Sequence, residues 1–166
     1  MDSLNYLPAL PSNIDELLAL LRRIALWLKG KGLTQWEDFL EEKGRLILEK
    51  RFREGKVYKV LHGSALIGIY VVQDDDVFWH QMRKDNLACW VHTMGVDPDH
   101  IGRGVGAQIL AQIEEMARLA GKKFVRLDCM DDNPKLCTFY ESQSFQKVGI
   151  QSWKEWQIRL YEKTIG

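Results

Sequence analysis

The chain has 166 residues, of which 46% are hydrophobic and 28% are charged, as in ordinary globular proteins. At this length we expect a single domain covering residues 1–166. Lysine plus arginine balance aspartate plus glutamate at 23 each, so we expect no nucleic-acid partner, and no run of about 18 apolar residues would span a membrane.

The cysteines and the first residues indicate a cytoplasmic protein. Cys89, Cys129 and Cys137 cannot all pair and lack C-x-x-C spacing, so we interpret them as reduced thiols. The opening MDSLNYLPALPSN has no basic region followed by an apolar core, so it does not resemble a secretory signal. A single catalytic cysteine is an alternative interpretation.

Two helices are predicted first. Asn13 and Glu16 have the spacing of a capping box and open a helix that ends near Gly30. Apolar residues recur in it at intervals of three and four, which indicates one buried face. The same capping spacing recurs in the segment 34–52 and predicts a second helix, with Gly44 as its weak point.

Strands dominate the next part of the chain, where β-branched and aromatic residues are frequent. We expect strands over Val57–His62, Ala65–Gln73, Val77–His80 and Cys89–Val96, the first two joined as a hairpin by Gly-Ser. A helix over 104–120, the strand Phe124–Cys129, a helix capped by Asn133 and a last strand in WQIRLYEK follow. This order predicts a mixed α/β domain with one parallel crossover flanked by hairpins.

The segment GVDPDHIGRGVGAQIL carries a glycine-rich turn into a helix. Such a turn leaves backbone N–H groups free at the positive end of the helix dipole, so it suits an anion, although a plain tight turn is the alternative. No Gly-Lys-Ser/Thr follows, which excludes a P-loop. Gly102, Gly104 and Ala107 fit a dinucleotide fingerprint, with Asp128 about 20 residues later, but DPDHI separates the turn from its strand.

Two segments together resemble the GNAT superfamily of N-acetyltransferases. GVDPDHIGRGVG is similar to the acyl-CoA-binding signature, in which R/Q-x-x-G-x-G/A follows V-x-P. Gly104 and Gly106 match this signature, whereas Ile101 stands where the family usually has Arg or Gln.

The second signature lies about thirty residues further along the chain. VRLDCMDDNPKLCTFYESQSF resembles it through Asn133, Tyr140 and Phe145, while Ser144 replaces the usual glycine. The resemblance implies a GNAT-like fold, with a central mixed, mostly antiparallel sheet flanked by helices. It also implies transfer of an acetyl group from acetyl-CoA to an amine by direct attack, with no metal.

The resemblance also implies which residues bind the cosubstrate. Met94 and Val96 would pair through their main chain with the pantetheine arm, as an edge strand pairs with a peptide. The Val96 amide would also reach the thioester oxygen. The expected cofactor-binding residues are Met94, Val96, Ile101, Gly102, Arg103, Gly104, Val105, Gly106, Ala107, Asn133 and Tyr140.

Two residues are the candidates for proton transfer. Tyr140 stands at the general-acid position of the family and would protonate the departing thiolate; packing on the sheet is its alternative role. His92 is the candidate base, because strand alternation places it on the face of Met94 and Val96. His80 and Glu141 are weaker candidates for the base.

The acceptor site is expected around the connection between the first two helices and the central strands. Gln35, Trp36, Trp79 and His92 are the expected substrate-binding residues, for the amine of a small molecule or a peptide. The run Asp74–Asp76 either attracts a cationic acceptor or is a solvated turn. A non-catalytic acyl-CoA-binding module and a dinucleotide-binding protein are the alternative functions, and a homodimer is left open.

Overall fold

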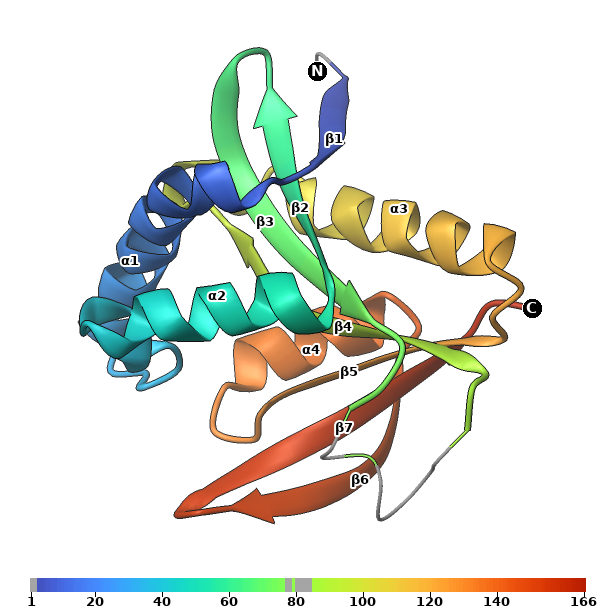
Figure 1. Cartoon of the computed structure of the whole chain (residues 1–166). Coiled ribbons are helices and arrows are strands. Elements are labelled where there is room, and N and C mark those ends of the chain that lie inside the picture. The colour runs from blue at the N-terminus through green and yellow to red at the C-terminus, as the bar shows by residue number, and fades with distance from the viewer. Residues whose placement is uncertain (1–2, 77–78, 80–84) are drawn as a thin grey trace. The chain divides into compact units, whose positions relative to one another are not determined.

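The structure is a computed structural model that describes residues 3–76, 79 and 85–166 (Figure 1). Among these residues a seven-stranded sheet has the strand order β1-β2-β3-β4-β5-β7-β6 and is accompanied by four α-helices. The strands are β1 (Leu4–Pro8), β2 (Lys56–His62), β3 (Ala65–Gln73), β4 (Ala88–Val96), β5 (Phe124–Met130), β6 (Gln146–Trp153) and β7 (Trp156–Thr164). The helices are α1 (Ile14–Gly30), α2 (Lys43–Glu54), α3 (Val105–Leu119) and α4 (Pro134–Ser142), with short 3-10 turns η1 (Pro11–Asn13), η2 (Glu37–Leu40) and η4 (Pro98–His100).

The sheet is mixed, as the sequence predicts. β1 pairs with β2 and β7 pairs with both β5 and β6 in antiparallel registers, whereas β4 and β5 run parallel. The helix α3 connects this parallel pair, which is the crossover that the order of elements predicted. Within the described residues, no helix is long and apolar enough to cross a membrane.

The described residues fall into two compact units. Unit 1 holds those of Met1–Val71 and Thr93–Gly106, and unit 2 holds those of Val72–His92 and Ala107–Gly166. Strands β3 and β4 and helix α3 each contribute residues to both units. Each unit has its own packed interior, described below, and the single domain stays a prediction.

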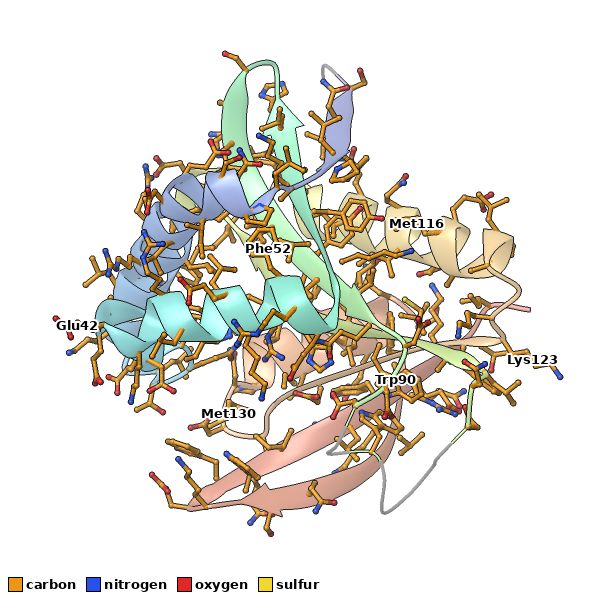
Figure 2. The ribbon with its side chains drawn as sticks, in the orientation of Figure 1. Glu42, Phe52, Trp90, Met116, Lys123 and Met130 are labelled. Carbon is orange, nitrogen blue, oxygen red and sulfur yellow. The ribbon has the colours of Figure 1, made fainter. Side chains whose placement is uncertain are left out.

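The core of unit 1 is formed by the apolar face of α1 with α2, β2 and β3. Leu17, Leu21 and Leu48 are fully buried in it, and Phe52 of α2, labelled in Figure 2, packs against it. The predicted spacing of apolar residues in α1 is therefore confirmed. The cap differs from the prediction, because the Asn13 side chain accepts the N–H of Leu10 (2.8 Å) instead of an N–H of the helix.

The second helix begins later than predicted. Trp36 has φ +68°, which is incompatible with a continuous helix, and η2 follows before α2 begins at Lys43. Gly44 is not a weak point, because it lets two segments approach closely. A Cβ at Gly44 would lie 2.7 Å from the Cα of Phe39, so no larger residue fits there without movement.

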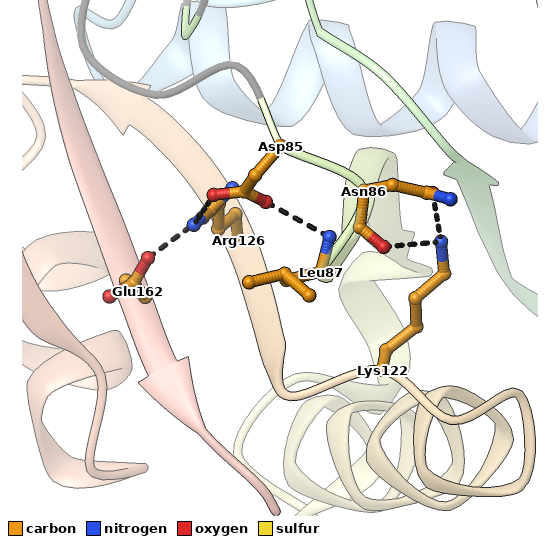
Figure 3. Close-up of polar contacts among 6 residues, drawn as sticks. All are labelled: Asp85, Asn86, Leu87, Lys122, Arg126 and Glu162. Atoms are coloured by element: carbon orange, nitrogen blue, oxygen red, sulfur yellow. Dashed lines mark hydrogen bonds and ion pairs between the residues drawn. The ribbon is translucent and has the colours of Figure 1, made fainter.

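Unit 2 is built around a buried arginine on β5. The Arg126 side chain is 0% exposed and donates to both carboxylate oxygens of Asp85 (2.9 and 2.8 Å) and to Glu162 on β7 (2.7 Å; Figure 3). Its guanidinium also lies 5.4 and 5.1 Å from the rings of Trp79 and Trp90, the latter labelled on β4 in Figure 2. This bidentate pairing compensates the burial of the charge and ties the beginning of β4 to β5 and β7.

Two strands were not predicted. β6 is exposed along most of its length, so it lacks the apolar alternation that marks a half-buried strand. β1 has five residues, is also largely exposed, and ends in Pro8. The expected strand Val77–His80 lies outside the described residues except for Trp79.

Candidate functional site

The turn after β4, in unit 1, is held by charged contacts. The Asp97 N–H donates to the carbonyl of Ile67 on β3 (2.8 Å), and its buried carboxylate accepts the N–H of Asp99 (3.0 Å). Arg23 of α1 contacts both carboxylates, at 3.2 Å for Asp97 and 3.0 Å for Asp99. The turn therefore has a defined conformation before it reaches the glycines.

Two glycines of this turn adopt a conformation that other residues avoid. Gly102 and Gly104 have φ +80° and +78°, and a Cβ built at either would meet nothing within 4 Å. Packing therefore does not require glycine there, whereas the backbone conformation does. Beyond them, Val105 and Gly106 open α3 with N–H groups that have no acceptor within the helix. Open space beside free N–H groups fits a diphosphate.

Ile101, one of the expected cofactor-binding residues, precedes the two glycines. Its backbone is extended, and its N–H donates to the carbonyl of Pro98 (3.4 Å), which ends η4. The side chain is 45% exposed. The N–H of Ile101 thus already has an acceptor, and the exposed Gly102 and Arg103 follow it.

Strand β4 approaches Trp36 closely within unit 1. A Cβ at Gly95 would lie 2.9 Å from the Trp36 ring and 2.9 Å from the side chain of Ile24. The indole therefore lies against the backbone between Met94 and Val96, the two residues expected to pair with pantetheine. Glycine inside a strand pattern is a known sign of such an approach, so the sequence carried this signal.

Gln35 and Trp79, two other expected acceptor residues, lie in different units. Gln35 precedes Trp36 and is half-buried, so it stays beside the same surface. Trp79 is fully buried against Arg126 in the interior of unit 2. This position favours packing, and we leave Trp79 out of the acceptor site proposed below.

Tyr140 lies on α4 in unit 2. The Asn133 side chain caps this helix by accepting the N–H of Leu136 (3.2 Å), with Pro134 in the first turn, as predicted. Tyr140 is buried, and burial raises the pKa of its phenol far above the usual value of 10.0. The phenol therefore keeps its proton at neutral pH.

Ser144 replaces the glycine of the family signature and has a backbone conformation typical of glycine. The family usually has glycine there, and Ser144 takes φ +67°, the left-handed conformation that glycine favours. The N–H of Ser144 donates to the carbonyl of Glu141 (3.0 Å) and so ends α4. The departure from the signature therefore leaves the backbone conformation in place.

Two buried thiols lie near Tyr140. The sulfur atoms of Cys129 and Cys137 are 3.7 Å apart, and burial raises the pKa of the Cys129 thiol. A thiol that resists ionisation is a poor nucleophile, so Cys129 does not fit the alternative of a catalytic cysteine.

Glu141, a weaker candidate for the base, belongs to a separate network. Its carboxylate accepts the hydroxyl of Tyr161 (2.7 Å) and lies 3.5 Å from Arg159, which also donates to Asp131 (2.6 Å). These contacts hold α4 to β7 within unit 2. Glu141 is thus already engaged, which weakens it as a base.

His92 has a carboxylate partner that the sequence did not indicate. Its Nε2 lies 3.1 Å from Oδ2 of Asp76, and the two side chains are 11% and 2% exposed. Thr93 follows with φ +47°, so the simple alternation that related His92 to Met94 does not continue through it. His80, the other histidine candidate, lies outside the described residues.

The pairing of strand β5 with its neighbours changes along its length. Its parallel register with β4 joins Ala88–Trp90 to Phe124–Arg126 and, among the described residues, goes no further. The remaining part of β5, Leu127–Met130, continues to pair with β7 on its other side.

Comparison with known proteins identifies the class. A sequence profile of the family described as "Acetyltransferase (GNAT) family" matches residues 19–145, well over half of the chain. The chain belongs to this family. It is an acetyltransferase that moves an acetyl group from acetyl-CoA to an amine, and its acceptor is not identified by these similarities.

Similar proteins and solved structures are also described as acetyltransferases. The chain is 24% identical over 163 residues to the uncharacterized N-acetyltransferase YesJ of Bacillus subtilis, covering 95% of this chain and 88% of YesJ. A GNAT acetyltransferase structure from Listeria monocytogenes matches with a TM-score of 0.76 and 25% identity, over 97% of this chain and 94% of the other. A Bacillus subtilis acetyltransferase solved in complex with CoA has the same fold, with a TM-score of 0.72 and 16% identity over 99% and 100% of the two chains.

Proposed function

We propose that this acetyltransferase acts by direct attack of a primary amine, supplied by a small molecule or a peptide, on acetyl-CoA. The observation that carries the proposal is the place of Tyr140, which stands at the general-acid position of the family signature on the helix that Asn133 caps. The cytoplasmic location and the homodimer stay predictions of the sequence.

Backbone groups of the segment that runs from β4 into the start of α3 bind the cosubstrate in this proposal. The N–H groups of Gly102, Arg103, Gly104, Val105, Gly106 and Ala107 hold the diphosphate, and the turn fixed by Asp97 positions them. The main chain of Met94 and Val96 pairs with the pantetheine arm. Asn133 caps the beginning of α4, the helix that carries Tyr140 near its other end. Bound acetyl-CoA supplies the acetyl group as a thioester.

Proton transfers are divided between two residues. The amine must lose a proton before attack, because an alkylammonium has no lone pair, and His92 accepts that proton directly or through water. Tyr140 donates its proton to the sulfur that leaves, a step typically worth about 10²–10⁴ in rate. Trp36 and Gln35 border the acceptor, with the indole offering its face to an organic cation.

The test is release of CoA thiol with spermidine, kanamycin, lysine and an alanine-initiated peptide as acceptors. Tyr140→Phe should lower turnover at least tenfold and leave acetyl-CoA binding intact, because the phenol acts on the leaving sulfur. Tyr6→Phe, on β1 of unit 1, is the matched control and should turn over normally. Equal turnover of Tyr140→Phe and wild type would remove Tyr140 as the acid.

Binding experiments separate the two alternative functions. Thermal stabilisation by acetyl-CoA without thiol release for any amine would indicate a binding module, since a ligand that binds the native state raises its stability. Stabilisation by NADH but not by acetyl-CoA would indicate the dinucleotide-binding alternative.

A further inference from the structure

Arg23 of α1 contacts the turn between β4 and α3 through one nitrogen atom. Its Nη2 donates to Oδ1 of Asp97 (3.2 Å) and to Oδ2 of Asp99 (3.0 Å), and all three residues belong to unit 1. The Asp97 side chain is 8% exposed, whereas those of Arg23 and Asp99 are 56% and 78% exposed. A pair of exposed side chains contributes little, but a buried carboxylate needs a partner that compensates its charge. The contact with Asp97 is therefore the more important of the two.

Asp97 is the residue that organises the first part of this turn. Its carboxylate accepts the N–H of Asp99 (3.0 Å), its carbonyl accepts the N–H of His100 (2.8 Å), and its own N–H donates to Ile67 of β3 (2.8 Å). Nδ1 of His100 lies 3.7 Å from the same carboxylate oxygen, which is too far for a hydrogen bond. Arg23 thus gives Asp97 a charge-assisted hydrogen bond that His100 does not supply.

The next residue of α1 contacts the strand that leads into the turn. A Cβ at Gly95 would lie 2.9 Å from Cδ1 of Ile24, so Ile24 packs against the backbone of β4 two residues before Asp97. Ile24 and Arg23 therefore contact successive parts of one segment, the end of β4 and the turn. A regular helix with a buried face is a rigid support for both contacts.

We propose that Arg23 is a positioning residue for acetyl-CoA that acts through Asp97 and Asp99. It holds the first part of the turn in one conformation, so that the N–H groups from Gly102 onward are arranged for the diphosphate before the cosubstrate binds. A site that is already ordered loses less conformational freedom on binding, which raises affinity. This role rests on the proposed place of the diphosphate, whereas the contact of Arg23 with the turn does not.

Amide hydrogen exchange in the full-length protein without cosubstrate tests the effect on the turn. In Arg23→Met the N–H groups of Asp99 and His100 should exchange about tenfold faster than in wild type, because their acceptors lose the contact with α1. Arg45→Met is the matched control: Arg45 of α2 donates to Asp15, about 12 Å before Arg23 along α1, so this variant loses the same charge and should keep the wild-type exchange. Unchanged exchange in Arg23→Met would overturn the proposal.

Calorimetric titration with acetyl-CoA tests the role in binding, at a temperature at which all variants are folded. Arg23→Met should raise Kd about tenfold, the factor expected for one lost hydrogen bond between charged groups, and Arg45→Met should keep the wild-type Kd. At saturating acetyl-CoA, kcat of Arg23→Met should stay within about twofold of wild type, because Arg23 contacts the turn and not the reacting atoms. An unchanged Kd, or a loss confined to kcat, would overturn the proposal.

Asp97→Ala separates positioning from simple attraction between charges. It removes a negative charge near a bound anion, so charge alone would tighten binding, whereas loss of the ordered turn should raise Kd for acetyl-CoA about tenfold. In the Asp97→Ala background, Arg23→Met should change Kd less than about threefold, since its main contact is already absent. Tighter binding by Asp97→Ala, or the full effect of Arg23→Met in that background, would overturn the proposal. Failure of the wild type to bind acetyl-CoA would instead refute the proposed function and leave the exchange result standing.

Discussion

Substitution of Gly104 by alanine separates the conformational role of this glycine from its role in binding. Gly104 has φ +78°, and an L-residue in the left-handed region costs roughly 1–2 kcal/mol. For a protein of this size that cost lowers Tm by about 2–4 °C for each kcal/mol. An added Cβ meets no protein atom within 4 Å, so no clash adds to the cost.

The binding effect is larger if a phosphate lies beside Gly104. A hydrogen bond to a charged group contributes about 1.5–3 kcal/mol, and each 1.4 kcal/mol corresponds to a factor of about ten. Alanine keeps the backbone N–H, but its Cβ enters the open space in which the phosphate would lie and should displace it from that N–H, which raises KM for acetyl-CoA about tenfold or more. The assay is thiol release at varied acetyl-CoA, with Tm measured in parallel.

Gly63 provides the matched control. It lies in the turn between β2 and β3 with φ +60°, and a Cβ there also meets nothing within 4 Å. Gly63→Ala should lower Tm as much as Gly104→Ala and leave KM unchanged. Equal KM values for the two variants would refute the phosphate cradle.

Two further predictions concern stability. Arg126→Met should lower the free energy of unfolding by about 3–5 kcal/mol in urea titrations, because Asp85 and Glu162 lose the guanidinium that compensates their charges; a loss below about 1 kcal/mol would contradict a tightly paired core. Burial raises the pKa of Tyr140 above 10.0, so the folded state binds its proton more tightly, and this contribution to stability is lost as pH rises above about 10. Tyr140→Phe should therefore lose less stability than wild type between about pH 9 and pH 11, and identical slopes would contradict the buried phenol.

The elements with one buried face could be predicted from the sequence, because burial of one face spaces apolar residues at regular intervals along the chain. The spacing of Leu17, Leu21 and Leu28 defined α1, and the β-branched run in Ala65–Gln73 defined β3. β6 could not be found in this way, because a strand with exposed faces has no apolar alternation. The start of α2 was misplaced since the left-handed conformation of Trp36 leaves no mark in local propensity.

Features of the candidate site that depend on local backbone conformation could be predicted from the sequence. Contacts between side chains that are far apart in the sequence could not. The glycines at 102 and 104 and the cap at Asn133 follow from local rules, and the structure places them as expected. The contact between Asp76 and His92 joins residues that are well separated in the sequence, so spacing carries no sign of it. Trp79 lies in a core cluster, and the sequence could not decide between packing and binding for it, because an aromatic residue looks the same in a core and in a pocket.

Local sequence patterns say least about the acceptor-binding residues. Trp36 lies against Gly95, and a half-buried aromatic face there suits several kinds of organic amine equally well. The acceptor screen is therefore informative for the substrate, whereas the cradle and Tyr140 concern acetyl transfer itself.

Mass spectrometry of a reaction with acetyl-CoA labelled in its acetyl group tests the central claim most directly. If transfer is direct and Tyr140 is the acid, the label appears on the amine in step with thiol release, the protein without an amine carries no label, and Tyr140→Phe forms the product at least tenfold more slowly. Label on a cysteine of the protein before it reaches the amine, or product formed by Tyr140→Phe at the wild-type rate, would contradict direct transfer with Tyr140 as the acid.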